Sequence, residues 1–106
     1  MWRAKVVYRP EANADVQRIL TVVTERSGSA IVARRFVDRI LARCEKIGDA
    51  PHGGRPRDDL APGLRTVPFE RVAVIVYCLT DVVVISNVFY GGRDYEALYL
   101  PSEDAS

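Results

Sequence analysis

Two segments with helical periodicity are separated by only three residues, Ser27, Gly28 and Ser29, and this break constrains the fold more than any other feature of the sequence. Glycine supplies the left-handed conformation that ends a helix, and serine is a preferred N-cap for the next helix. Helices joined by so short a turn must run antiparallel. The sequence therefore predicts a helical hairpin.

Each predicted helix has one apolar stripe. In the first helix, which begins at Pro10, the stripe consists of Val16, Ile19, Leu20 and Val23. In the second helix, which ends at Gly48, it consists of Ala33, Phe36, Val37, Ile40, Leu41, Cys44 and Ile47. Charged residues occupy the other faces, where Arg34 and Asp38 have the spacing of an ordinary ion pair. We expect the stripes to be core and the charged faces to be solvated.

Strand patterns lie on both sides of the hairpin. Residues 2–8 alternate, with Trp2, Ala4, Val6 and Tyr8 on one face, and predict a first strand. A stretch rich in proline and glycine over residues 50–63 is interpreted as a surface loop. Three more strands are predicted after it, at Leu64–Phe69, Val72–Leu79 and Val82–Tyr90.

The predicted strands differ in character. The middle one of the last three is apolar almost throughout, as expected of a central strand, whereas Pro68 indicates an exposed side on its own strand. The order β-α-α-β-β-β predicts an α+β fold in which a helical hairpin packs on one face of a small, mainly antiparallel sheet. The other face, or a groove beside it, is expected to be free for a partner.

Length and charge restrict the possible functions. With 106 residues the chain has room for one core, so we expect a single domain over residues 1–100 and a flexible tail over residues 101–106. A formal net charge of +1 gives little general attraction to nucleic acid. No apolar run approaches the roughly 18 residues that cross a bilayer. The expected location is the cytoplasm, without membrane contact.

No cluster of catalytic or metal-binding residues stands out. A hydrolase or nuclease needs a general base, a general acid and a group that stabilises negative charge. The only histidine, His52, lies in the predicted loop without cysteine or carboxylate at metal-ligand spacing. Cys44 and Cys78 fall separately within apolar patterns, which favours buried side chains over a disulfide. We predict no catalytic residue, no metal and no cofactor.

Three blocks of sequence, in their order, resemble the ParE-type toxins of the RelE/ParE superfamily. They are GRPRDDLAPGLR over residues 54–65, the strand over residues 71–77, and VFYGGRD over residues 88–94. The likeness extends from the first strand through Asp94. It implies a RelE/ParE-like fold and the toxin of a type II toxin–antitoxin system, a class linked to plasmid stabilisation. The sequence departs at Tyr90, where many members have histidine.

The resemblance also implies partners. ParE-type toxins are known for poisoning DNA gyrase, which implies a protein-binding inhibitor and not an enzyme. A cognate antitoxin would wrap its C-terminal segment around the toxin in a hetero-oligomer, a heterotetramer, and its N-terminal part would bind operator DNA. The toxin would meet operator DNA only through this antitoxin.

The binding residues are predicted from side-chain character. For the antitoxin we expect the hairpin residues Val16, Ile19, Phe36, Val37 and Ile40, all of which are core candidates too. For the target we expect residues near the end of the chain, Arg93, Tyr95, Leu98 and Tyr99. Aromatic and arginine side chains are frequent anchors of protein interfaces.

Two alternatives remain open at this point. RelE-type relatives cleave mRNA on the ribosome with arginines on the sheet and a tyrosine near the C-terminus, and the corresponding residues are Arg65, Arg71, Arg93 and Tyr99. Against this, no lysine follows the second helix, and Pro68–Phe69 stands about where a further catalytic arginine would be. The arginines also fit structural ion pairs with Glu70, Asp81 or Asp94. The other alternative is a degenerate toxin that acts only as a co-repressor with its antitoxin.

Overall fold

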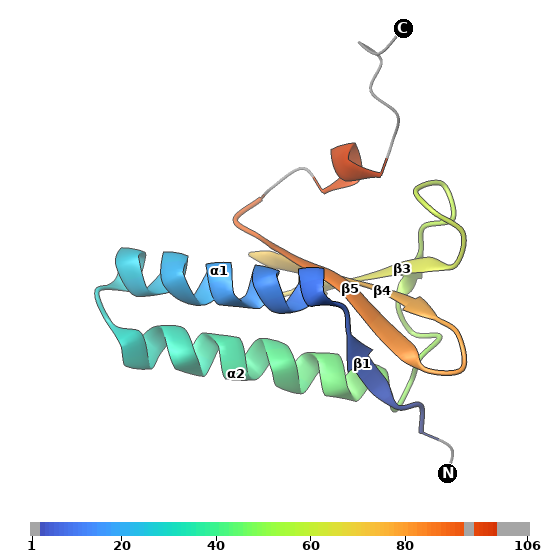
Figure 1. The fold of residues 1–106 in the computed structure, drawn as a ribbon, viewed down its shortest axis with the longest axis horizontal. Coiled ribbons are helices and arrows are strands. Elements are labelled where there is room, and N and C mark those ends of the chain that lie inside the picture. Colours follow the sequence, from blue (N-terminus) through green and yellow to red (C-terminus); the bar gives the residue numbers. More distant parts are fainter. Residues whose placement is uncertain (1–2, 93–94, 100–106) are drawn as a thin grey trace, which may run out of the picture.

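A computed structural model of the protein describes residues 3–92 and 95–99. The elements are β1 (Val6–Tyr8), α1 (Pro10–Ser27), α2 (Ala30–Ile47), β2 (Arg55–Pro56), β3 (Leu64–Phe69), β4 (Ala73–Leu79), β5 (Val83–Tyr90) and the 3₁₀ helix η1 (Glu96–Leu98). Figure 1 shows the two long helices side by side as a hairpin next to the sheet. The predicted α+β architecture is confirmed, with β2 and η1 as additions.

The strands form one mixed sheet in the order β1-β5-β4-β3-β2. The pairs β2–β3, β3–β4 and β4–β5 are antiparallel, whereas β1 pairs with β5 in parallel. β4 is the central strand, as its apolar sequence predicts. The first strand is shorter than predicted and begins at Val6. The reason is that the Ala4 N–H donates to the Gly48 carbonyl at the end of α2, at 2.9 Å, and not to a neighbouring strand. Trp2 lies outside the described residues.

Local sequence determines the ends of the helices. Pro10 occupies the first turn of α1, where its missing N–H costs nothing. Gly28 ends α1 with φ of 70°, and its N–H donates to the Thr24 carbonyl. The Ser29 hydroxyl then accepts a hydrogen bond from the Val32 N–H at 3.2 Å and caps α2. The predicted hairpin turn is confirmed.

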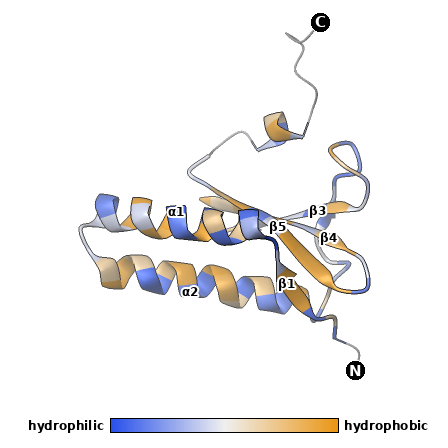
Figure 2. Cartoon of the chain, in the orientation of Figure 1, coloured by the Kyte–Doolittle hydropathy of each residue, from blue (hydrophilic) through white to orange (hydrophobic). Residues whose placement is uncertain are grey.

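The main core lies between the hairpin and the sheet. The apolar residues of α1 and α2 face β3, β4 and β5 there, and Phe36 contacts the rings of Phe69 and Tyr90 with centroids 5.8 and 5.6 Å away. Along both helices, hydrophobic and hydrophilic residues alternate as expected of surface helices (Figure 2). Cys44 is buried in this core and Cys78 is half-buried, and both thiols are free. No helix among the described residues is long and apolar enough to span a membrane.

The stretch over residues 50–63 is more than the predicted surface loop. It contains strand β2, and Gly54 and Leu60 are buried. The reason is Tyr77, whose side chain lies in the core and whose hydroxyl needs partners. The hydroxyl donates to the Pro51 carbonyl at 2.7 Å and accepts from the Gly54 N–H at 3.0 Å. The Tyr77 hydroxyl, from strand β4, thus holds the loop in position.

The outer face of the sheet, opposite the helices, is partly covered. A second apolar cluster lies there and consists of Leu60, Leu64, Val76 and Phe89. Tyr95 and Tyr99 from the end of the chain pack against it. Of the two surfaces expected to be free for a partner, the second face is therefore partly covered, because the loop and residues 95–99 shield its apolar side chains.

Candidate functional site

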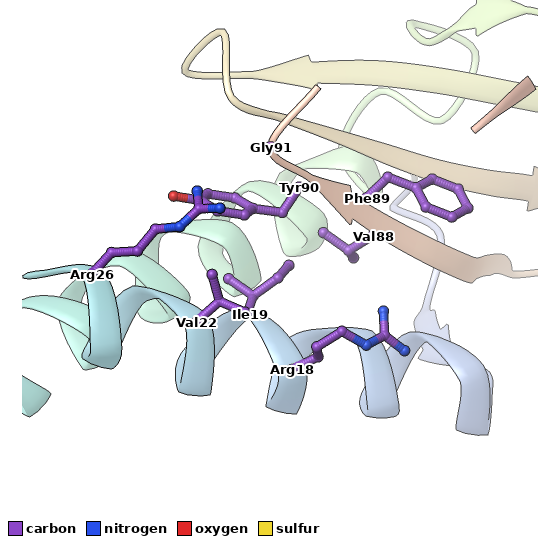
Figure 3. Close-up of a pocket in the computed structure, with 8 residues that line it drawn as sticks. All are labelled: Arg18, Ile19, Val22, Arg26, Val88, Phe89, Tyr90 and Gly91. Atoms are coloured by element: carbon purple, nitrogen blue, oxygen red, sulfur yellow. The ribbon is translucent and has the colours of Figure 1, made fainter. Parts of the chain in front are cut away.

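A groove runs between α1 and the end of β5. Its lining residues are Arg18, Ile19, Val22, Arg26, Val88, Phe89, Tyr90 and Gly91. Ile19 and Val88 are 3% and 1% exposed and form its apolar floor. Figure 3 shows Arg18 and Arg26 on α1 on either side of Ile19 and Val22, with Tyr90 facing them from β5. The Arg26 guanidinium lies over the Tyr90 ring, 5.9 Å from its centroid.

The groove exists because β5 is longer than β1, its neighbour at the edge of the sheet. β1 pairs with β5 only from Val83 to Ile85, since the chain turns into α1 at Pro10. Beyond Ile85, the outer edge of β5 therefore has α1 beside it and no strand of the described part of the chain. The sheet is also irregular at this point, where the β4–β5 register shifts between Val76 and Tyr77.

A buried carboxylate joins α1 to this strand edge. Asp15 is 5% exposed and accepts hydrogen bonds from the Val88 N–H and from Asn87 Nδ2, both at 3.0 Å. Arg18 adds an ion pair at 3.2 Å. The oxygen of the Asn87 side chain accepts from the Tyr99 hydroxyl at 2.8 Å. One hydrogen-bonded chain therefore connects α1, the edge of β5 and the end of the described chain.

Contacts at Tyr95 and Glu96 also hold residues 95–99 on the outer face of the sheet. The Tyr95 ring stacks on Phe89 with centroids 5.7 Å apart. The buried Arg57 binds Glu96 at 2.9 Å, Asp59 at 2.8 Å and the Tyr95 hydroxyl at 3.3 Å. The hydrogen bond from Arg57 lowers the pKa of Asp59, so this carboxylate remains charged. These contacts give the segment a defined position.

The predicted target-binding residues have different surroundings. Tyr95 and Tyr99 are half-buried against the sheet, and burial raises the pKa of the Tyr99 hydroxyl. Leu98 is 55% exposed and available to a partner. Arg93 lies outside the described residues.

The predicted antitoxin-binding residues lie in the interior of the isolated chain. Their exposed fractions are 7% for Val16, 3% for Ile19, 8% for Phe36, 3% for Val37 and 0% for Ile40. All five belong to the core between the hairpin and the sheet. Of these five, Ile19 also lines the groove.

Of the residues of the ribonuclease alternative, the three that the structure describes lie at different places on the sheet. The Arg65 guanidinium donates to the carbonyls of His52 and Gly54 at 2.9 and 2.7 Å. Arg71 lies in the turn at the other end of β3, with φ of 61°, and Tyr99 lies on the outer face. The expected partner Glu70 binds Arg39 rather than a strand arginine. Within the described ranges, no three His, Cys, Asp or Glu side chains gather as a metal site would require.

Comparison with known proteins assigns the family. Residues 6–95 match the model of the ParE toxins of type II toxin–antitoxin systems, parDE. The chain belongs to this family. The match includes both helices and every strand, so the ParE family accounts for the whole framework of the groove.

A solved structure has the same fold as this ParE-family chain. It is described as "Chromosomal ParDE TA system from P. aeruginosa" and has a TM-score of 0.73 at 19% sequence identity. The alignment covers 84% of this chain and 97% of that chain. None of the curated proteins matches the sequence.

Three parts of the site in this ParE-family protein were missed from the sequence. Asp15 lies beside Val16 on the inner side of α1. An acidic residue next to the apolar stripe was the available signal of a buried carboxylate. Arg57 was assigned to a surface loop, although its partners Tyr95 and Glu96 come from the end of the chain. The groove itself depends on the early end of β1, which no local pattern indicates.

Proposed function

We propose that this ParE-family toxin is held inactive by a cognate antitoxin in the α1–β5 groove and that the free toxin inhibits DNA gyrase by binding. The observation that carries the proposal is the composition of the groove. Its floor is apolar, Tyr90 forms one wall, and Arg18 and Arg26 lie along α1. Apolar, aromatic and arginine side chains in one depression are typical of protein interfaces. An antitoxin segment with apolar residues between acidic ones would complement it.

The target contact is proposed for the end of the chain, at Arg93, Tyr95, Leu98 and Tyr99. Among these, Leu98 is an exposed apolar residue between two tyrosines that are anchored to the sheet. A backbone segment that its neighbouring side chains already hold in place loses little conformational entropy on binding. This favours a binding role for the segment over a catalytic one.

The first experiment is DNA supercoiling by purified gyrase with increasing toxin, alone and with its antitoxin. We expect lost supercoiling and trapped cleaved DNA, both reversed by the antitoxin. Unimpaired supercoiling with a large excess of folded toxin would contradict the gyrase target. Cleaved transcripts in a translating extract would instead support the ribosome-dependent endonuclease. Normal growth on induction of the toxin alone would support the co-repressor.

The groove is tested with Val22→Glu. Val22 lines the groove and is half-buried, so a carboxylate there meets an apolar floor once a partner covers it. We expect antitoxin binding, measured by calorimetry, to weaken at least ~10-fold, since the new carboxylate lies one turn from both Arg18 and Arg26, pairs with them in place of the acidic residues of the antitoxin and repels those residues. Gln17→Glu is the matched control, because Gln17 is exposed on the same helix and does not line the groove. Equal affinities for the two variants would remove the groove from the interface. Ile19→Glu is unsuitable because it would disrupt the core.

Leu98→Glu tests the target contact independently. The side chain is 55% exposed, so the fold and antitoxin binding should be retained. We expect gyrase inhibition to weaken. Full inhibition by this variant would exclude Leu98 from the contact.

The assembly follows from the same proposal. We propose a cytoplasmic toxin–antitoxin hetero-oligomer, a heterotetramer, that contacts operator DNA through the antitoxin. Light scattering of the purified complex measures its stoichiometry. A different mass would contradict the heterotetramer.

A further inference from the structure

Charge is unevenly distributed about the axis of α2. The helix contains five basic and two acidic residues, whereas the whole chain has a net charge of +1. Arg35, Arg39, Arg43 and Lys46 follow one another at intervals of four, four and three residues, so they lie along one side of the helix. We call these four residues the basic row. Both acidic residues of the helix lie on a different side.

Most of the basic row has no partner among the residues that the structure describes. Asp38 forms its ion pair with Arg34, outside the row, at 3.1 Å, and Glu45 bonds to Tyr8. Glu70 binds Arg39 with two hydrogen bonds of 2.8 and 3.1 Å. Within residues 3–92 and 95–99, the side chains of the other three members of the row form no hydrogen bond and no ion pair. The row therefore keeps three uncompensated positive charges.

The surroundings of the row indicate the chemistry of its partner. Protein interfaces depend on buried aromatic or aliphatic anchors. From Arg39 to Lys46 the neighbouring surface side chain is Ala42, and Phe69 at the bottom of the adjacent depression is only 8% exposed. Ile31 and Val32, which are 66% and 49% exposed, lie one turn before Arg35 at the start of α2. The stretch from Arg39 to Lys46 therefore offers charge without an apolar anchor. It complements a polyanion better than an acidic protein.

The dimensions of the row suit a phosphate backbone. From Arg35 to Lys46 the helix rises about 16 Å, and a DNA strand places one phosphate every ~3.4 Å along its axis. Guanidinium groups bind phosphate oxygens in bidentate geometry. We propose that the basic row of α2 contacts the phosphate backbone of duplex DNA. The toxin would then touch DNA directly, in addition to any contact made through an antitoxin.

The test is fluorescence anisotropy of a labelled mixed-sequence duplex titrated with the full-length protein, free of antitoxin and gyrase. Three phosphate contacts predict that the logarithm of the binding constant falls against the logarithm of salt concentration with a slope of about −2.7. The row variant carries Arg35→Gln and Arg43→Gln, which preserve helix propensity. The control carries Arg9→Gln and Arg55→Gln, two exposed residues outside the row, and loses the same net charge.

For the row variant we expect at least ~10-fold weaker binding at low salt and a slope of about −0.9, because one contact remains. The control should retain nearly the full slope. Equal losses in the two variants would show a general charge effect and overturn the proposal. So would the absence of binding by the unmodified protein at about 50 mM salt, or tighter binding of a polyglutamate peptide than of DNA. Circular dichroism confirms that each variant is folded.

Discussion

Replacing Asp15 by alanine should destabilise the domain more than an alanine substitution at any other position of α1 outside the apolar stripe. The carboxylate is 5% exposed and accepts from a backbone N–H, an amide and a guanidinium. Alanine accepts none of these. The Val88 N–H at the edge of β5 then has no acceptor, because α1 occupies the place beside it where a strand would otherwise pair.

The magnitude can be worked out from these contacts. An unsatisfied buried N–H costs about 1–3 kcal/mol, and a lost hydrogen bond from Asn87 to a charged acceptor costs about 1.5 kcal/mol. The exposed Arg18 pair adds at most ~0.5 kcal/mol. We expect a total loss of about 3 kcal/mol in the free energy of unfolding, out of the roughly 5–15 kcal/mol that a domain of this size has.

Urea denaturation followed by circular dichroism measures this loss. With an m-value of about 1.5 kcal/mol per molar, the midpoint should fall by roughly 2 M. Arg18→Ala is the matched control, because it removes the exposed partner and leaves the buried carboxylate in place, and its midpoint should change by less than ~0.4 M. If Asp15→Ala shifts the midpoint no more than this control does, the carboxylate does not support the edge of β5 as argued.

Three further predictions concern stability. Tyr99→Phe removes the hydrogen bond to Asn87 and should lower the free energy of unfolding by about 1 kcal/mol, measured in urea; an unchanged midpoint would argue against a fixed end of the chain. Gly54→Ala places a Cβ 2.5 Å from the Tyr77 hydroxyl oxygen and should cost about 1–3 kcal/mol, so a neutral effect would contradict the close packing of the loop. Burial raises the pKa of the Cys44 thiol from 9.0 to about 12, so the unfolded chain releases this proton first and stability should fall as the pH rises from about 9 towards 12, by up to ~1.4 kcal/mol per pH unit. Cys44→Ala should flatten that decline, and an identical decline in both proteins would refute the assignment.

Features with a local cause were predictable from the sequence. The helical hairpin depends on Gly28 and Ser29, which end one helix and cap the next without help from distant residues. The central position of β4 follows from its uninterrupted apolar sequence. The ion pair between Arg34 and Asp38 needs only the spacing of one helical turn.

Features with a distant cause were not predictable. The role of Asp15 depends on the Val88 N–H, 73 positions along the chain. Arg57 has the composition of a loop residue, and only the return of Glu96 to its side gives it a buried ion pair. The apolar residues of the hairpin were assigned both to the core and to an interface. Core and interface residues show the same helical periodicity, so the pattern does not distinguish them. The groove arises because β1 is shorter than β5. This difference becomes important only once the two strands pair, so neither segment indicates it alone.

The parallel pairing of β1 with β5 also has a consequence for synthesis. Among the described strands β5 alone adjoins β1 in the sheet, and Val6 lies opposite Val83. On the ribosome, the hairpin can form early from local contacts, while β1 must wait for the last strand to emerge. Pairing over such a distance is slow and leaves apolar surface open to proteases in the meantime. A chain stopped before Val83 would thus lack the partner strand of β1, and we expect it to be degraded as an unfinished fold.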